Sequence, residues 1–203
     1  MRLILPANLG ADARNLMESN DLVARARQGD HEAFRLIFER EHRFVMRFLY
    51  AMVGERSLAE ELTQETFVRA YRRLNTIRTE VKVSTWLCGI ARNVALNWLR
   101  SHRKQEQSLA EESTVKEWVD DQASQPDRHL LNSELRRVIH NALVSLDDDK
   151  RLVFTLKIMQ QLSYEEIAAV TGHSIPKLKT DLHRAKAAIR RVLLPYLEKS
   201  DEL

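Results

Sequence analysis

Apolar residues recur at helical spacing along most of the chain. One apolar stripe lies within residues 57–74 and consists of Phe67, Ala70, Tyr71 and Leu74. A second lies between Asp30 and Gly54 and consists of Phe34, Ile37, Phe38, Val45, Phe48, Leu49 and Met52. Spacings of three and four residues place each set on one face of a helix. The pattern therefore predicts amphipathic helices around a buried core.

Residues with capping propensity mark where these helices should begin and end. Ser57 with Glu60, and Ser163 with Glu166, have the spacing of a capping box, in which two side chains bond free N–H groups at the start of a helix. Asp30 and Ser174 are predicted N-caps of two further helices, and Ser19 or Asn20 is the predicted cap of a short helix over residues 21–28. Gly29 and Gly54 are predicted to end the helices that precede them.

A polar loop over residues 75–84 precedes a helix with two different faces. The apolar face consists of Leu87, Ala91, Val94 and Trp98, and the polar face of Asn93, Asn97, Arg100 and Lys104. No acidic residue occurs from Trp86 to Gln105. Cations neutralise phosphate, asparagine bonds base edges and indole rings stack on bases, so this helix is suited to nucleic acid. The alternative interpretation is a solvated helix with core tryptophans.

The second half of the chain has the pattern of a helix-turn-helix. Amphipathic helices are expected over residues 129–146 and 151–162. The next residues have the spacing of a helix-turn-helix. Ala168 is the small residue expected where the two helices cross, and Gly172 is the glycine of the turn. The aliphatic residues expected to face inward are Ile167, Leu178 and Leu182. The last helix has a core face that consists of Leu178, Leu182, Ala185 and Ile189. Its other side carries Lys177, Lys179, Thr180, His183 and Arg184. Such a helix can enter the DNA major groove, although a three-helix bundle with a solvated basic helix has the same pattern.

The segment between the two halves differs in composition. Its only basic residues are Lys116 and Arg128, whereas its acidic residues are Glu106, Glu111, Glu112, Glu117, Asp120, Asp121 and Asp127. Poor periodicity predicts a flexible acidic linker. We therefore expect a mobile tail over residues 1–19, a helical domain over 20–105, the linker over 106–128 and a second helical domain over 129–203.

Composition supports an all-α fold and narrows the range of functions. The 203 residues include five glycines and four prolines, and the net charge of +3 is too small to indicate nucleic acid by itself. A single cysteine, Cys88, excludes an internal disulfide and favours a reducing compartment. The chain has neither a signal-peptide pattern nor an apolar run of membrane-spanning length, so a cytoplasmic protein without membrane contact is expected. The histidines and carboxylates show no metal-site or catalytic-triad spacing, so we expect no metal, no cofactor and no enzyme activity.

Two segments resemble a known family. Residues 59–74 (AEELTQETFVRAYRRL) and 84–104 (STWLCGIARNVALNWLRSHRK) resemble region 2 of the extracytoplasmic-function (ECF) sigma factors of the sigma-70 family, and the helix-turn-helix resembles region 4. The resemblance implies that region 2 docks on the clamp helices of core RNA polymerase through Glu60, Glu61, Gln64 and Glu65. It also implies that region 2 opens the −10 element by contacting the non-template strand through Trp86, Arg92, Asn93, Asn97 and Arg100, with the 75–84 loop as a pocket for a flipped base.

By the same resemblance, region 4 reads the −35 duplex through Lys177, Lys179, Thr180, His183 and Arg184. The chain departs from the usual family pattern at three positions. Asp181 replaces an arginine of the recognition helix, which bears on the promoter sequence. Leu58 replaces an acid and Thr63 replaces an aliphatic residue in the segment that docks on polymerase.

The departure at Thr63 suggests a switch. A phosphate there would restore about −1.5 to −2 charges beside Glu60 and Glu61, and the chain resembles the ECF groups linked to Ser/Thr kinases. The alternative is that Thr63 only packs, since it shares a helix side with Phe67 and Ala70, and a kinase needs it at least partly accessible. Control by an anti-sigma factor stays open, as does a free-standing helix-turn-helix regulator that acts without polymerase.

Overall fold

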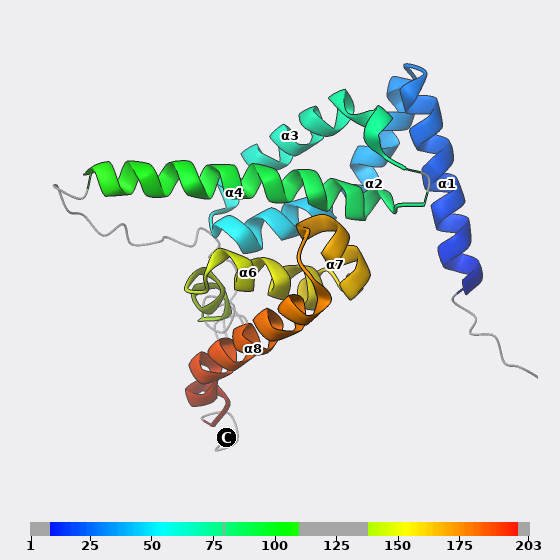
Figure 1. The fold of residues 1–203 in the computed structure, drawn as a ribbon. Coiled ribbons are helices and arrows are strands. Elements are labelled where there is room, and N and C mark those ends of the chain that lie inside the picture. The colour runs from blue at the N-terminus through cyan, green and yellow to red at the C-terminus, as the bar shows by residue number, and fades with distance from the viewer. Residues whose placement is uncertain (1–8, 79, 110–137, 199–203) are drawn as a thin grey trace, which may run out of the picture.

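The chain folds into helices without a strand among the residues that the structure describes. The computed structural model describes residues 9–78, 80–109 and 138–198 (Figure 1). Its elements are α1 (Leu9–Arg27), α2 (His31–Val53), α3 (Arg56–Arg72), the 3-10 turn η1 (Leu74–Thr76), α4 (Val83–Leu109), α6 (Asp148–Phe154), the π-helical turn η2 (Thr155–Met159), α7 (Tyr164–Thr171) and α8 (Ile175–Glu198). Residues 138–144 are also helical. The all-α prediction is confirmed, while most of the predicted acidic linker lies outside the described residues.

Several predicted helix boundaries are confirmed. The Asp30 side chain accepts a hydrogen bond from the Ala33 N–H, and Gly54 ends α2 with a φ of 89° that favours glycine. The capping box of Ser163 and Glu166 is present in full, because the Glu166 N–H donates to Ser163 Oγ and the Ser163 N–H donates to Glu166 Oε2.

Two other boundary predictions are wrong. Helix α3 begins at Arg56, directly after the extended N-cap residue Glu55, so Ser57 already lies inside the helix and donates to Glu55 instead of forming a capping box. The reason is that Gly54 ends α2 only one residue earlier, which leaves no room for a longer connection. Helix α1 begins at Leu9, so Ser19 and Asn20 do not cap it, and part of the predicted tail is helical.

Helices α2, α3 and α4 pack around the largest apolar cluster, with α1 across one end (Figure 1). Most residues of the predicted apolar stripes are buried there. Phe38 and Tyr71 differ, because they are 37% and 40% exposed. Their rings pack edge-on against Phe67 and Phe34, with centroids 4.8 and 4.9 Å apart, so they form the outer edge of the stripe.

The second half forms the predicted helix-turn-helix. Gly172 has a φ of 74° in the turn between α7 and α8, and its N–H donates to the Ala168 carbonyl. Leu178, Leu182 and Ile189 on α8 are buried, as their spacing predicted. This geometry fixes which side of α8 remains available to a ligand.

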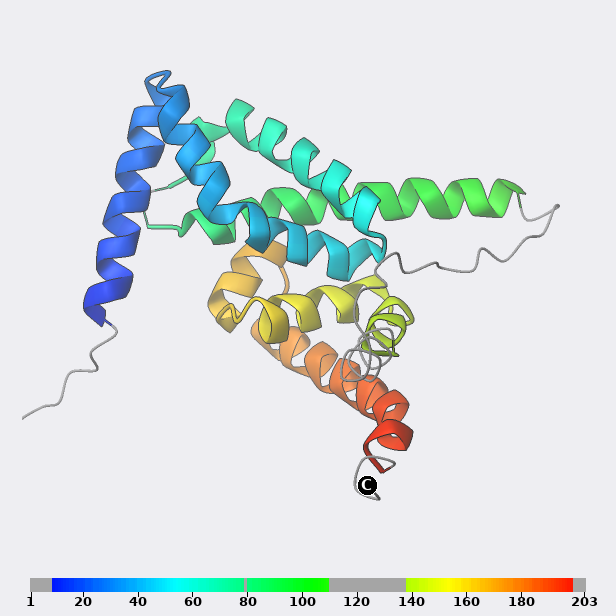
Figure 2. The same cartoon turned by 180° about the vertical axis from the view of Figure 1, so that it is seen from behind.

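The two halves share one apolar cluster. Leu152, Leu156 and Ile167 belong to the same cluster as the buried residues of α2–α4, and both views show α7 beside α4 and α6 beside α2 (Figures 1 and 2). Glu166 adds polar contacts across this boundary, since one of its oxygens accepts from Thr85 Oγ1 at 3.2 Å and lies 3.4 Å from Lys82 Nζ.

Arg151 is the central polar residue of this boundary. It is 5% exposed. Its guanidinium donates to the carbonyls of Leu143 (3.0 Å), Leu146 (3.0 Å) and Val144, which end the 138–144 helix, and to the Met52 carbonyl of α2 at 2.6 Å. One cation therefore pairs buried carbonyls from both halves of the protein.

Substitution of Arg151 by methionine should destabilise the protein. The change preserves much of the side-chain volume but leaves four carbonyls without their donor, so we expect a loss of about 3 kcal/mol or more in the free energy of unfolding. Urea denaturation measures this change. Arg190→Met, at an exposed position of α8, is the control and should change the free energy of unfolding by less than about 0.5 kcal/mol. Equal effects of the two substitutions would contradict the role of Arg151.

Candidate nucleic-acid and protein interfaces

The polar face of α4 is open to solvent where the sequence predicted it. Asn93, Asn97 and Arg100 are exposed and lie along one side of the helix. Arg103, further along, is also exposed but pairs with Asp148 of α6 at 2.5 Å. Because the helix has no acidic residue from Trp86 to Arg103, the exposed amides and Arg100 form a surface that can meet a polyanion.

Trp86 and Arg92, the other two residues predicted to contact the −10 element, are only partly buried. The indole N–H of Trp86 donates to Thr76 Oγ1 at 3.2 Å, which joins the start of α4 to the start of the loop. The Arg92 guanidinium donates to Asn93 Oδ1 at 3.2 Å, while its buried Nε has no hydrogen-bond partner. Arg92 therefore orients Asn93.

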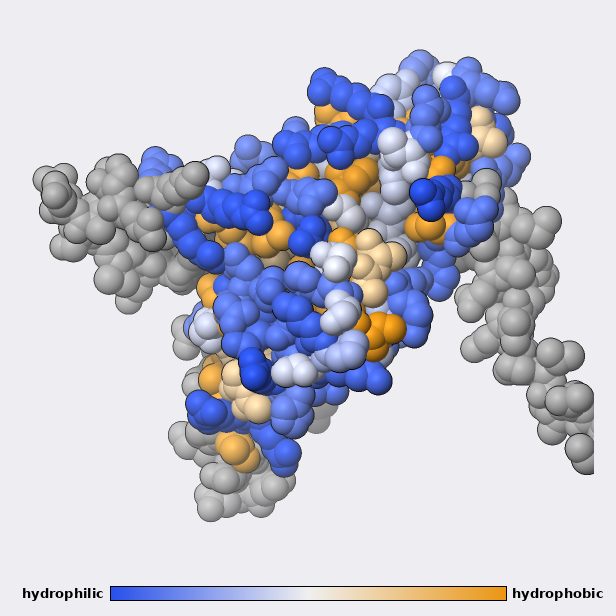
Figure 3. Space-filling view, in the orientation of Figure 1, coloured by the Kyte–Doolittle hydropathy of each residue, from blue (hydrophilic) through white to orange (hydrophobic). Residues whose placement is uncertain are grey.

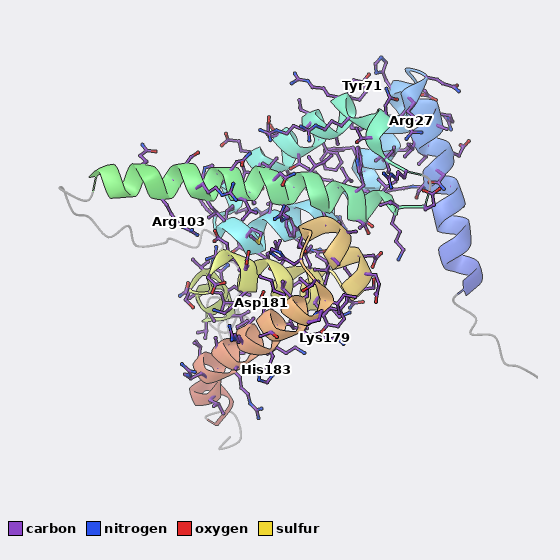
Figure 4. The ribbon with its side chains drawn as sticks, in the orientation of Figure 1. Arg27, Tyr71, Arg103, Lys179, Asp181 and His183 are labelled. Atoms are coloured by element: carbon purple, nitrogen blue, oxygen red, sulfur yellow. The ribbon has the colours of Figure 1, made fainter. Side chains whose placement is uncertain are left out.

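A surface pocket of about 190 Å³ lies beside the first residues of the loop. Its lining residues are Ala26, Arg27, Gly29, Tyr71, Arg72, Leu74 and Asn75. Among the described residues of the predicted loop, Asn75 is the one that lines the pocket. Arg27 was not predicted from the sequence. It donates to the carbonyls of Leu74 (2.9 Å) and Ile77 and so connects α1 to the loop (Figure 4). No local pattern could reveal a contact between residues that are 47 positions apart.

Four of the predicted −35 residues form an exposed group on α8. Lys179, Thr180, His183 and Arg184 are all exposed, and much of the surface over α8 is hydrophilic in Figure 3. Lys179 Nζ lies 5.7 Å from the centroid of the Tyr164 ring. These side chains are free to enter a groove of a duplex.

Lys177, the fifth predicted −35 residue, has a different environment. Its ammonium lies 2.7 Å from Asp181 Oδ2 and 2.8 Å from Asp149 Oδ2 of α6. The hydrogen bonds that Lys177 donates to Asp149 and Asp181 raise the pKa of Lys177, and the bond to Asp149 lowers the pKa of that carboxyl group. Asp181, which replaces an arginine of the usual family pattern, is buried beside this lysine.

The four residues of α3 predicted to contact polymerase have two kinds of environment. Glu60 pairs with Arg56 at 3.2 Å, and Glu65 pairs with Arg69 at 2.5 Å. Glu61 and Gln64 are exposed, and in the part of the chain that the structure describes no side-chain partner is found for either. These two side chains are therefore the most available to another protein.

Thr63 is fully buried within α3. Its hydroxyl donates to the Ala59 carbonyl at 2.6 Å and lies 3.6 Å from the Met46 sulfur. Thr66, one turn later, is equally buried and donates to the Leu62 carbonyl in the same way. The packing interpretation of Thr63 thus has direct support, and this conformation does not expose the hydroxyl to a kinase.

Other chemistry is limited in the described residues. Cys88 is buried, and burial raises the pKa of its thiol, which makes it a poor nucleophile. No helix within 9–78, 80–109 or 138–198 has the length and apolarity needed to cross a bilayer. The exposed polar faces of α3, α4 and α8 therefore remain the candidate functional surfaces.

Comparison with known proteins gives consistent matches along the chain. Sigma-70 region 2 matches residues 37–105, and Sigma-70, region 4 matches residues 136–189. The RNA polymerase sigma-H factor of Pseudomonas aeruginosa is 30% identical over 189 residues, covering 90% of this chain and 97% of that protein. The ECF RNA polymerase sigma-E factor of Escherichia coli K12 is 30% identical over 183 residues, covering 88% and 95%.

Solved structures show the same fold. The sigma factor RpoE of Bartonella quintana, in complex with the anti-sigma factor NepR, has a TM-score of 0.63 at 21% identity, over 79% of this chain and 96% of that one. CnrH, in complex with the cytosolic domain of CnrY, has a TM-score of 0.63 at 22% identity, over 87% and 97%. The arrangement of helices is therefore shared with both.

Proposed function

The chain belongs to the ECF group of the sigma-70 family, and on this premise we propose that it binds core RNA polymerase and directs promoter-specific initiation of transcription. The observation that carries the proposal is the pair of exposed polar helix faces, on α4 and α8, held on one shared apolar cluster. A sigma factor makes and breaks no bonds, so these faces need only bind DNA and polymerase. A free-standing regulator would leave the α4 face and the α3 surface without a role.

The α4 face is suited to the −10 element. Unpairing a base costs a few kcal/mol, which stacking and hydrogen bonds to the extruded base can offset. Asn93 and Asn97 provide amides for base edges, and Arg100 provides a cation for phosphate. A concave site lies at Tyr71 and Asn75, where α1, the end of α3 and the start of the loop meet. We propose that this surface holds the non-template strand.

The α8 face is suited to the −35 duplex. Lys179, Thr180, His183 and Arg184 are exposed on the first turns of the second helix of a helix-turn-helix, which is the part of such a helix that reaches base edges. Region 4 then reads the duplex while region 2 holds the separated strand.

Replacement of Asn97 by alanine should impair strand opening more than duplex binding. The substitution removes an exposed amide but no core contact, so we expect about a tenfold loss of open complex, which corresponds to about 1.4 kcal/mol. Permanganate reactivity of unpaired thymines measures opening on promoter fragments selected by the holoenzyme. Asn141→Ala, an exposed asparagine outside both DNA surfaces, should have no effect. Equal losses for both variants would contradict the assignment of the α4 face.

The α3 surface is suited to polymerase docking. We expect Glu61→Ala to weaken binding of purified core polymerase about tenfold, because Glu61 has no internal partner among the described residues and its charge is available to a basic surface. Equilibrium binding to immobilised core enzyme measures the effect. Glu39→Ala makes the same charge change on α2, where Glu39 pairs with Arg35, and should leave the affinity unchanged. Loss of affinity in both variants would indicate general electrostatics instead of a docking site at α3.

We also propose that phosphorylation of Thr63 raises the affinity for polymerase. Leu58 leaves α3 with fewer acids than relatives usually carry, and a phosphate would add about −1.5 to −2 charges near Glu60 and Glu61. Because Thr63 is fully buried, a kinase must act on a state in which this part of α3 has opened. The phosphate ester has lost the hydroxyl proton that was donated to Ala59, and its charge then prevents the side chain from returning to its buried position.

Thr66 provides the matched control for this switch. Thr63→Glu should bind core polymerase more tightly than the unmodified protein, whereas Thr66→Glu, which buries the same charge one turn away, should not. Thr63→Val tests the packing role and should preserve both stability and basal affinity. Equal loss of folding and binding in the two glutamate variants, measured by thermal melting and core binding, would overturn the switch.

Control by an anti-sigma factor is a second proposal. The sigma factor RpoE of Bartonella quintana, which shares this arrangement of helices, was solved in complex with the anti-sigma factor NepR. A partner that stabilises the docked arrangement of the two halves would keep the α4 and α8 faces from binding promoter DNA together. Recovery of a proteinaceous inhibitor that dissociates when core polymerase binds would support this mode of control.

A further inference from the structure

An ion cluster joins the start of the recognition helix α8 to the first turn of α6. Lys177 lies at its centre, bonded to Asp181 on its own helix and to Asp149 on α6. His173, in the turn before α8, lies 3.6 Å from the same Asp149 oxygen. The cluster therefore links α6, the turn and the recognition helix through four side chains.

Burial makes this cluster more than an exposed ion pair. The side chains of Asp149 and Lys177 are 52% and 41% exposed, but that of Asp181 is only 12% exposed. Ion pairs between exposed groups exchange easily with other charges and contribute little. If Lys177 moved to a DNA phosphate, Asp181 would remain in a largely buried site without its cation, which is costly. The buried carboxylate therefore holds the lysine.

The net charge of the cluster also indicates that Lys177 stays with its carboxylates. One ammonium faces two carboxylates, so Lys177, Asp149 and Asp181 together carry a net charge of −1. Such a group has no positive charge to offer a phosphate. Lys179 and Arg184, in contrast, have no carboxylate partner among the ion pairs of the described residues.

We propose that Asp181 and Asp149 are positioning residues that keep Lys177 off the DNA and tie the recognition helix to α6. This inference rests on the proposed binding of α8 to the −35 duplex. On this helix, cations such as Lys179 then neutralise the DNA phosphates. The unusual acid at position 181 binds a lysine of the protein itself and does not contact DNA. Asp181 thus sets which cations of α8 remain free to meet DNA.

The first test uses the free protein and needs no DNA. Lysine ammonium groups held by hydrogen bonds exchange slowly with water, so NMR of nitrogen-labelled lysine distinguishes held from free groups. We expect a slowly exchanging Lys177 signal in the wild type, with exposed Lys186 as the free reference. The signal should be lost in the Asp149→Asn, Asp181→Asn double variant. A Lys177 group that exchanges as fast as Lys186 in the wild type overturns the proposal.

The second test measures the salt dependence of promoter binding by the reconstituted holoenzyme. Each phosphate contact contributes about 0.9 to the slope of log K against log salt concentration. We expect Lys177→Ala to leave the slope unchanged and Lys179→Ala to reduce it by about 0.9. The Asp149→Asn, Asp181→Asn variant should steepen the slope by about the same amount, and adding Lys177→Ala to it should restore the wild-type value.

The outcomes separate this inference from the proposed function. A slope that falls equally in Lys177→Ala and Lys179→Ala overturns the holding of Lys177, while α8 remains a DNA-binding helix. A slope that changes in none of the variants, with the Lys177 signal still slow, overturns DNA binding by α8 and the inference with it. Thermal melting of each variant excludes a folding defect as the cause.

Discussion

The contact between the helix-turn-helix half and α2–α4 is the constraint on which the rest of the structure depends. Arg151 lies at its centre, where it donates to carbonyls that end the 138–144 helix and to the Met52 carbonyl of α2. Buried carbonyls must be paired, so one guanidinium couples the ends of two helices from different halves. Gly54 allows this approach, because a Cβ there would lie 3.0 Å from His140 Nε2. The positions of α4 and α8 relative to each other follow from this contact.

Local charge, and not the net charge of the chain, determines which surfaces can meet DNA. The first turn of α6 supplies an acid to each of the two helices proposed to bind DNA, since Asp148 pairs with Arg103 of α4 and Asp149 pairs with Lys177 of α8. One cation of each helix is thereby paired from one turn of α6. Promoter DNA that contacts both faces must compete with these pairs or use the cations that they leave free. The docked arrangement therefore limits the DNA-binding surface as well as positioning it.

The features that sequence reasoning recovered depend on residues close together in the chain. The apolar stripes, the Ser163 capping box and the turn at Gly172 are set by spacings of a few residues, and the structure confirms them. The features that it missed depend on distant residues. Arg151 and Met52 are 99 positions apart, and Lys177 and Asp149 are 28 apart, so neither pair could be predicted from periodicity. The capping box at Ser57 failed because Gly54 ends the preceding helix too close to it.

A sigma factor acts on promoters only together with polymerase. Transcription from a pool of genomic fragments, with core polymerase alone, with the chain alone and with both together, examines this requirement. We expect a discrete set of transcription start sites that appears only when both are present. Sequence-specific binding to duplex DNA by the chain alone, with no new start site on addition of core polymerase, would contradict it.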